Sequence, residues 1–255
     1  MVILRTAAEI AAMRESGRIV ARTLSAVSAA ARPGVRLDEL DLLAADLIAA
    51  EGAKPSFLGY HPRWAPMPYP AVVCLSVNDH IVHGIPSRHV LAEGDLLSVD
   101  CGAHLDGYHA DAAVTVGVGA IDERARTLKE TAQRALAAGI AAAVPGNRIG
   151  DISHAVETVA RAAGYGLPEG MGGHGIGTRM HEDPSVPNTG RPGRGLLLRE
   201  GLVIAIEPML VESGSDDSVT AADGWTIRTA DGSRAAHAEH TIAVTTDGPV
   251  VLTTA

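Results

Sequence analysis

The sequence predicts an α+β fold, because helical patterns and short apolar strands follow one another in two successive batches. Hydrophobic residues make up 46% of the 255 residues but aromatic residues only 3%, so aliphatic side chains must fill the core. That length is compatible with one large domain or two small ones. With this apolar fraction and a net charge of −9, we expect a folded chain rather than a disordered one.

Helices are indicated by apolar residues at helical spacing and by capping residues at their ends. Thr6 can cap the first helix, and Glu9 completes a capping box. Gly52 is placed to end the second helix. The expected helices are 7–31, 37–51, 122–143 and 149–163, and the expected, mainly antiparallel strands are 71–77, 96–101, 108–118, 202–210, 225–229, 237–245 and 250–253.

A weak internal repeat is the most informative feature of the chain. The matched segments are Pro33-Gly34-Val35-Arg36-Leu37 with Pro145-Gly146-Asn147-Arg148-Ile149, Gly52 with Gly164, His83-Gly84-Ile85 with His174-Gly175-Ile176, Leu91-Ala92-Glu93-Gly94 with Leu198-Arg199-Glu200-Gly201, and His109-Ala110-Asp111 with His237-Ala238-Glu239. Because these matches occur in the same order, we expect a single domain over residues 1–255. Its similar halves, about 1–118 and 119–255, would be related by a pseudo-twofold axis.

The repeat pairs acidic residues. Asp100 corresponds to Glu207 at the end of an apolar run, and Asp111 corresponds to Glu239 before one. A single acid at a strand end is usually a solvated turn residue, but shared repeat positions favour convergence on a common centre. Ionised carboxylates among apolar strands are costly unless they are paired or bound to metal. The pattern therefore predicts a metal site.

His174 lies in a glycine-rich segment, 170–177, that formally contains GxGxxG. A dinucleotide loop needs a buried strand before it and a packed helix after it, and neither is indicated here. Room for a metal or substrate is the better interpretation of these glycines. One imidazole with several carboxylates suits manganese, iron, cobalt or zinc, and the number of acids favours two ions. Paired ions of this kind are typical of hydrolysis.

These residues lie in motifs that resemble those of the type I methionine aminopeptidases. The motifs are His83-Gly84-Ile85-Pro86, Asp100, Asp106-Gly107-Tyr108-His109-Ala110-Asp111, Gly173-His174-Gly175-Ile176-Gly177, His181-Glu182-Asp183-Pro184, Ile206-Glu207-Pro208-Met209 and Glu239-His240-Thr241. The resemblance runs from Thr6 to the C-terminus. It implies the pita-bread fold, in which two pseudo-symmetric halves share a central curved, mainly antiparallel sheet that is covered by helices.

The resemblance also implies roles for individual residues. The metal ligands would be Asp100, Asp111, His174, Glu207 and Glu239, with Asp111 and Glu239 bridging two divalent ions (Co, Mn, Fe or Zn). Glu207 would also move the proton of the attacking water. His83 and His181 would hold and polarise the scissile amide. Phe57, Tyr60, Tyr69, Met180 and Trp225 would line the methionine pocket.

Some positions depart from the family pattern. The loop 61–68 is longer than usual, which puts the rim of the pocket in doubt. Trp64 within it has an alternative interpretation as part of a small satellite core. Gly102, Ala112 and Ala113 stand where hydroxyl residues are frequent, and losing such hydrogen bonds alters metal affinity. Met180 replaces a frequent Phe.

The expected function is metal-dependent removal of the N-terminal methionine from nascent proteins whose second residue is small. The alternatives are an X-Pro-type pita-bread peptidase and a catalytically silent pita-bread binding protein. We expect a monomer that meets its peptide substrates in transient proximity to the ribosome. The acidic balance argues against nucleic-acid binding, and no apolar run is long enough to span a membrane. Cys74 and Cys101 form no disulfide framework, which favours a cytoplasmic location.

Overall fold

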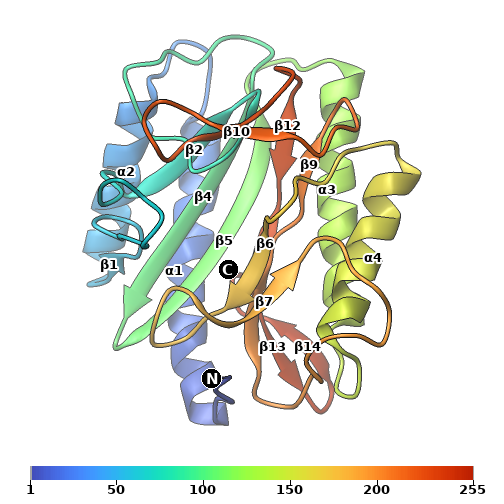
Figure 1. Cartoon of the computed structure of the whole chain (residues 1–255). Coiled ribbons are helices and arrows are strands. Elements are labelled where there is room, and N and C mark those ends of the chain that lie inside the picture. The colour runs from blue at the N-terminus through green and yellow to red at the C-terminus, as the bar shows by residue number, and fades with distance from the viewer. Residues whose placement is uncertain (1, 255) are drawn as a thin grey trace.

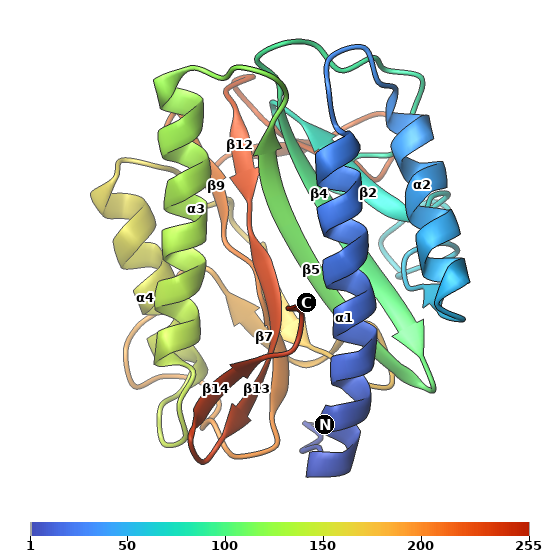
Figure 2. The ribbon, with the colours of Figure 1, turned by 180° about the vertical axis from the view of Figure 1, so that it is seen from behind.

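The computed structural model describes residues 2–254. Helices α1 and α3 pack against one face of a strongly curved sheet. Helix α2 lies on the outer side of α1, and α4 lies on the outer side of α3 (Figures 1 and 2). The helices are α1 (Ala7–Ala30), α2 (Leu37–Ala50), α3 (Glu123–Ala142) and α4 (Ile149–Ala162). The strands are β1 (Lys54–Pro55), β2 (Val73–Val77), β3 (His80–Val82), β4 (Leu96–Leu105), β5 (Tyr108–Gly117), β6 (Gly172–Gly175), β7 (Glu182–Pro187), β8 (Val203–Ile206), β9 (Met209–Val211), β10 (Ser218–Thr220), β11 (Ile227–Thr229), β12 (Ala235–His237), β13 (Glu239–Thr245) and β14 (Gly248–Val251).

The main sheet runs β1-β4-β5-β13-β8-β6-β7, with β2 on β4 and β14 on β13, and every pairing is antiparallel. The long β4–β5 hairpin comes from the first half of the chain. The β8–β13 pair comes from the second half. The two meet where Glu239 and His240 of β13 pair with Ala113 and Ala112 of β5. The predicted α+β class is confirmed by this antiparallel sheet and its four helices.

The helices begin and end within one residue of their predicted bounds, because their end signals are local. Thr6 Oγ1 accepts a hydrogen bond from the Glu9 N–H at 3.3 Å, and Glu9 Oε2 accepts one from the Thr6 N–H at 2.8 Å, as a capping box requires. Asp122 caps α3 by accepting a hydrogen bond from the Ala125 N–H at 2.7 Å.

The strand prediction is less accurate in the second half. The expected strand 202–210 is two strands, β8 and β9, which are separated at Glu207 and Pro208. Proline has no N–H group to donate to the hydrogen bonds of a β-ladder, so the strand is interrupted there. The expected strand 237–245 is likewise divided into β12 and β13 at Ala238. The Ala238 N–H donates to the Pro208 carbonyl oxygen at 3.2 Å, so the two breaks lie beside each other.

The glycine-rich segment 172–175 forms a strand, β6, which the sequence did not predict. Glycine and histidine have low strand propensity, so pairing with β7 and β8 decides the conformation here. A Cβ added to Gly173 would collide with the carbonyl oxygen of Ala205 on β8. Close approach of two backbones thus requires glycine at this position.

Matched turns precede α2 and α4. The Gly34 N–H donates to the Leu91 carbonyl oxygen at 2.8 Å, and the Gly146 N–H donates to that of Leu198 at 3.1 Å. Both glycines have positive φ angles, +90° and +94°, which residues with a Cβ atom rarely adopt. The repeated Pro-Gly segments thus adopt the same local geometry in each half of the chain.

Three large clusters of buried hydrophobic residues fill the space between helices and sheet and around the cavity described below. Alanine, valine, leucine and isoleucine dominate the first two clusters, as the composition predicts. Within residues 2–254, no helix combines the length and the apolar character that crossing a bilayer requires.

The N-terminal segment is tied to the strand that follows His181. Arg5 Nη2 donates to Glu182 Oε1 and Oε2 at 2.7 and 2.6 Å, and both side chains are only 4% exposed. The Arg5 N–H also donates to the Gly201 carbonyl oxygen at 2.7 Å. Since Glu182 is the first residue of β7, this buried ion pair fixes the start of β7.

We expect Arg5→Ala to lower the free energy of unfolding by about 1.5–3 kcal/mol, because Glu182 would lose its buried charged partner and keep only hydrogen bonds from the Arg179 N–H and the Thr178 hydroxyl. Arg18→Ala is the matched control, since Arg18 and Glu15 form an ion pair that is 45% and 54% exposed; exposed pairs contribute about 1 kcal/mol or less. Urea unfolding measures both variants. Equal stability of the two would contradict the assignment.

Candidate metal centre

The sheet register carries the predicted acidic residues to one place. Asp100 on β4 lies opposite Ala113 on β5, and Ala113 lies opposite Glu239 at the start of β13. These three positions form a row across adjacent strands. Asp111 lies two residues from Ala113 along β5, so it shares the same face of the sheet. Glu207 follows directly after β8, the other neighbour of β13.

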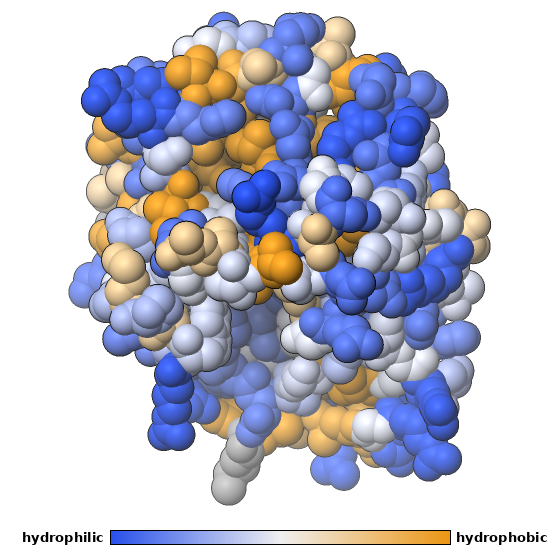
Figure 3. All heavy atoms as spheres, turned by 45° about the horizontal axis from the view of Figure 1, so that its top comes forward, coloured by the Kyte–Doolittle hydropathy of each residue, from blue (hydrophilic) through white to orange (hydrophobic). Residues whose placement is uncertain are grey.

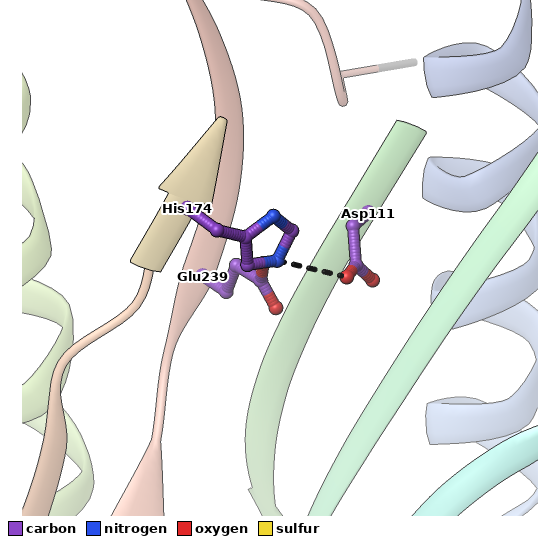
Figure 4. A group of neighbouring side chains, drawn as sticks. All are labelled: Asp111, His174 and Glu239. Carbon is purple, nitrogen blue, oxygen red and sulfur yellow. Dashed lines mark ion pairs between the residues drawn. The ribbon is translucent and has the colours of Figure 1, made fainter. Parts of the chain in front are cut away.

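His174 on β6 completes the group. Its Nε2 lies 3.6 Å from Glu207 Oε1 and 3.9 Å from Asp111 Oδ2, while its Nδ1 lies 2.9 Å from the Gly175 carbonyl oxygen. A hydrogen bond from Nδ1–H to that carbonyl leaves the Nε2 lone pair directed at the carboxylates. Figure 4 shows His174, Asp111 and Glu239 converging from three different strands.

Burial dominates the electrostatics of the site. Desolvation raises the pKa of Glu207 to about 7, although the nearby His174 opposes the shift. It also raises the pKa of Asp100 to about 7, and those of Asp111 and Glu239 well above their usual range, where neighbouring carboxylates add to the effect. Four acidic groups that are buried together therefore resist ionisation unless a positive charge lies beside them.

The donor atoms fit a divalent cation. Asp111, His174 and Glu239 offer one atom each within 4.8 Å of one another, and so do Glu207, His237 and Glu239. Glu239 belongs to both groups. Within residues 2–254, Asp100 Oδ1, Asp111 Oδ1 and Glu239 Oε1 are buried without a hydrogen-bond partner. Such orphaned acceptors are costly, and metal coordination is a usual way to satisfy them.

The cluster lies in a cavity of about 280 Å³. Its remaining lining consists of Phe57, Tyr60, Trp64, Tyr69, Cys74, His83, His181 and Trp225. One part of the cavity is thus charged and the other is aromatic. On the face shown in Figure 3, hydrophobic residues are interspersed with hydrophilic ones.

Each of the two predicted amide-binding histidines stacks on an aromatic ring. Tyr60 lies 5.1 Å from His181, and Trp64 lies 6.0 Å from His83, between ring centroids. Burial lowers the pKa of His83 to about 4 and that of His181 to about 3. Both imidazoles are therefore neutral near pH 7, so each can donate one hydrogen bond and accept one.

The loop 61–68 leaves the wall of the cavity and rejoins it close to its starting point. The Tyr69 N–H donates to the Tyr60 carbonyl oxygen at 2.8 Å, which joins the two ends of the loop. Trp225 Nε1–H donates to the Met67 carbonyl oxygen at 3.0 Å. Trp64 is 58% exposed and lies 4.9 Å from Trp225, edge to face. Trp64 is thus at the cavity mouth and not in a satellite core.

The structure brings together all the predicted site residues except one. Met180 is buried in the same cluster as Phe57 and Tyr69 but does not line the cavity. From the sequence, no role in the site was predicted for Cys74 or His237, although His237 occupies a repeat position two residues before Glu239. This repeat position is the sequence signal that could have identified His237 as a site residue.

Gly102, one of the residues that depart from the family pattern, has a packing explanation. A Cβ on Gly102 would lie 2.8 Å from Ser56 Cβ and 3.0 Å from a ring carbon of Phe57, so glycine leaves space for the pocket wall. Thr241 supplies a hydroxyl near the ligands. Its Oγ1 accepts from the Asp111 N–H at 3.0 Å and donates to the Asp111 carbonyl oxygen at 2.8 Å.

Comparison with known proteins gives the family. The sequence profile of metallopeptidase family M24 matches residues 11–246. The chain belongs to this family. Methionine aminopeptidase 1 of Mycobacterium tuberculosis is 54% identical to it over 98% of this chain and 94% of that protein. The predicted resemblance to the methionine aminopeptidases and the prediction of a metallopeptidase are thereby confirmed.

Solved structures agree with this placement in M24 and confirm the predicted pita-bread architecture. A methionine aminopeptidase from Thermotoga maritima has a TM-score of 0.95 at 39% identity and covers 100% of both chains. A prolidase from Pyrococcus furiosus has a TM-score of 0.76 at 23% identity, with 66% of its length covered, which shows a shared fold alone. The X-Pro alternative is therefore not favoured.

The pKa shifts predict how metal stabilisation depends on pH. Because folding raises the pKa of Asp100 and Glu207 to about 7, protonation of these groups favours the folded state. In protein stripped of metal, that contribution is present below about pH 4 and is lost as the pH rises through about 7. Divalent metal replaces the protons, so we expect Mn²⁺ to raise Tm more at pH 8 than at pH 5. Equal shifts in calorimetry would contradict this, and Asp100→Asn should reduce the difference.

Proposed function

We propose that this chain is a methionine aminopeptidase, which removes the N-terminal methionine from nascent proteins whose second residue is small. The observation that carries the proposal is the convergence of four carboxylates and His174 in one cavity with an aromatic wall. The acidic group suits metal-dependent hydrolysis. The aromatic wall suits a thioether side chain, because sulfur–ring contacts are favourable.

Two divalent ions would be held by Asp100, Asp111, His174, Glu207 and Glu239, with Glu239 common to both donor groups. The donor set accepts Co, Mn, Fe or Zn. When bound, such ions supply Lewis-acid activation of water and of the scissile carbonyl. Support for this assignment comes from the orphaned oxygens and from the raised pKa values of the buried acids.

Glu207 is the proposed proton carrier. Its carboxylate lines the cavity beside His174, where it would accept a proton from the attacking water and return it to the leaving amine. His83 and His181 contact the scissile amide as neutral donors and acceptors. Their aromatic neighbours restrict rotation of the rings, which keeps the histidines in position.

Phe57, Tyr60, Tyr69 and Trp225 are the proposed walls for the methionine side chain, and Met180 supports them from behind. Phe57 and Tyr69 meet edge to face at 6.4 Å, and Tyr69 and Trp225 do so at 5.0 Å. The Tyr69 hydroxyl donates to the Gly84 carbonyl oxygen at 2.9 Å, so it is not free to bind a polar side chain. An apolar first residue is therefore favoured.

The wider setting follows the same reasoning. We propose a cytoplasmic monomer whose substrates are N-terminal peptides of nascent proteins, met in transient proximity to the ribosome, with no nucleic-acid or membrane partner. We also propose that residues 1–255 form a single catalytic domain of two duplicated halves, about 1–118 and 119–255. The matched turns at Gly34 and Gly146 support this division.

The decisive experiment compares Met-Ala-Ser with Ala-Pro-Ala as substrates in the presence of Mn²⁺ or Co²⁺. We expect release of methionine from the first peptide and no cleavage of the second. Glu207→Gln should fold normally but lose about 10²-fold or more in kcat, because general acid–base catalysis is typically of that size. Cleavage of Ala-Pro-Ala would favour an X-Pro peptidase, and no cleavage with any of the metals would favour a silent binding protein.

Trp64→Ala should raise KM for Met-Ala-Ser about two- to tenfold and change kcat less, since an aromatic contact at the mouth is lost. Met67→Ala is the matched control, because Met67 is in the same loop, is 44% exposed and does not line the cavity. Steady-state kinetics with one metal at saturation measures both variants. Identical kinetics of the two would show that Trp64 has no part in binding.

A further inference from the structure

His237 is a buried imidazole beside the carboxylates to which the function proposed above gives no role. It ends β12 and is 1% exposed. Thr115 fixes its backbone on both sides: Thr115 Oγ1 donates to the His237 carbonyl oxygen at 2.8 Å and accepts from the His237 N–H at 2.9 Å. The ring is therefore held at a defined place in the site.

The Nε2 atom of His237 points at two of the acids. It lies 3.6 Å from Glu207 Oε2 and 3.8 Å from Glu239 Oε2. These separations are too long for hydrogen bonds, and among residues 2–254 Nε2 has no other hydrogen-bond partner. A buried nitrogen without a partner is unfavourable, so this atom requires a ligand or an ion to satisfy it.

The separations match those between atoms that share a cation. Oxygen and nitrogen ligands each lie about 2.0–2.2 Å from a zinc-like ion, which places neighbouring ligand atoms roughly 3–4 Å apart. His174 Nε2 lies 3.6 and 3.9 Å from its own two carboxylate oxygens, the same range as for His237.

We propose that His237 is an additional metal ligand, on the ion shared by Glu207 and Glu239. The proposal rests on the metal centre of the proposed function and deepens it. With His174 and His237, the centre would contain two imidazole nitrogens rather than one. Because imidazole suits Zn, Cu, Fe and Ni while Mn prefers oxygen, the second nitrogen shifts selectivity away from manganese.

The alternative is that His237 only orients a metal ligand, and the experiment must distinguish this role from direct metal coordination. His237 could hold Glu207 through a hydrogen bond and never contact metal. Removing such a partner would weaken binding of every metal to a similar degree. Removing a nitrogen ligand would instead weaken Zn²⁺ more than Mn²⁺, and it would change the number of imidazoles attached to the ion.

The test uses His237→Gln, with His240→Gln as the matched control. His240 is next to Glu239 in the chain, but its Nδ1 lies 2.8 Å from Thr253 Oγ1, with which it forms a hydrogen bond. Chelator competition in the absence of substrate should show Zn²⁺ affinity reduced at least about tenfold in His237→Gln, with a smaller loss for Mn²⁺. His240→Gln should match the wild type for both metals.

Proton NMR of the Co²⁺-loaded protein counts the ligated imidazoles through their paramagnetically shifted N–H signals. We expect the wild type and His240→Gln to share one shifted signal that is absent in His237→Gln. An unchanged set of signals, or equal losses of Zn²⁺ and Mn²⁺ affinity, would overturn the proposal. His237→Asn, checked for folding by circular dichroism, repeats the test if the glutamine variant unfolds. Because no peptide is used, failure here is distinct from failure of the peptidase assay.

Discussion

Repulsion among carboxylates that the fold removes from water is the constraint on which the site depends. Asp100, Asp111, Glu207 and Glu239 lie in one cavity, and burial makes each of them harder to ionise. A folded chain tolerates this arrangement only if protons or cations neutralise it. The same unfavourable electrostatics that weaken the metal-free fold would favour binding of a divalent cation. Stability and catalysis are therefore linked through a single cluster.

The sheet makes this arrangement possible because antiparallel register is strict. A slip of one residue in β5 or β13 would turn Asp111 or Glu239 to the opposite face of the sheet. The breaks at Glu207 and at Ala238 interrupt neighbouring strands, so Glu207 is freed from the ladder while Glu239 begins β13 and keeps its pairing with Ala113. Regular strand pairing sets the positions of the acidic residues in the sheet, and the two strand breaks set the directions of the side chains next to them.

The sequence predicted most of the fold and the acidic cluster because both leave local or periodic signals. Capping residues located the helices, and the internal repeat placed Asp100 with Glu207 and Asp111 with Glu239. Strand β6 was missed because its conformation comes from neighbours and not from its own glycines. The interpretation of Trp64 stayed open for a similar reason. Its environment depends on contacts with His83 and Trp225, which are distant in sequence.

The loop 61–68 is closed at its base and also contacts the cavity wall. A backbone hydrogen bond between Tyr60 and Tyr69 joins its ends. Within the loop, Trp64 stacks on His83, and the Met67 carbonyl oxygen accepts a hydrogen bond from Trp225. A change of length or composition in the loop would therefore reach the inner pocket through these two contacts, and a small molecule that extended from the pocket onto the exposed indole of Trp64 would be sensitive to both.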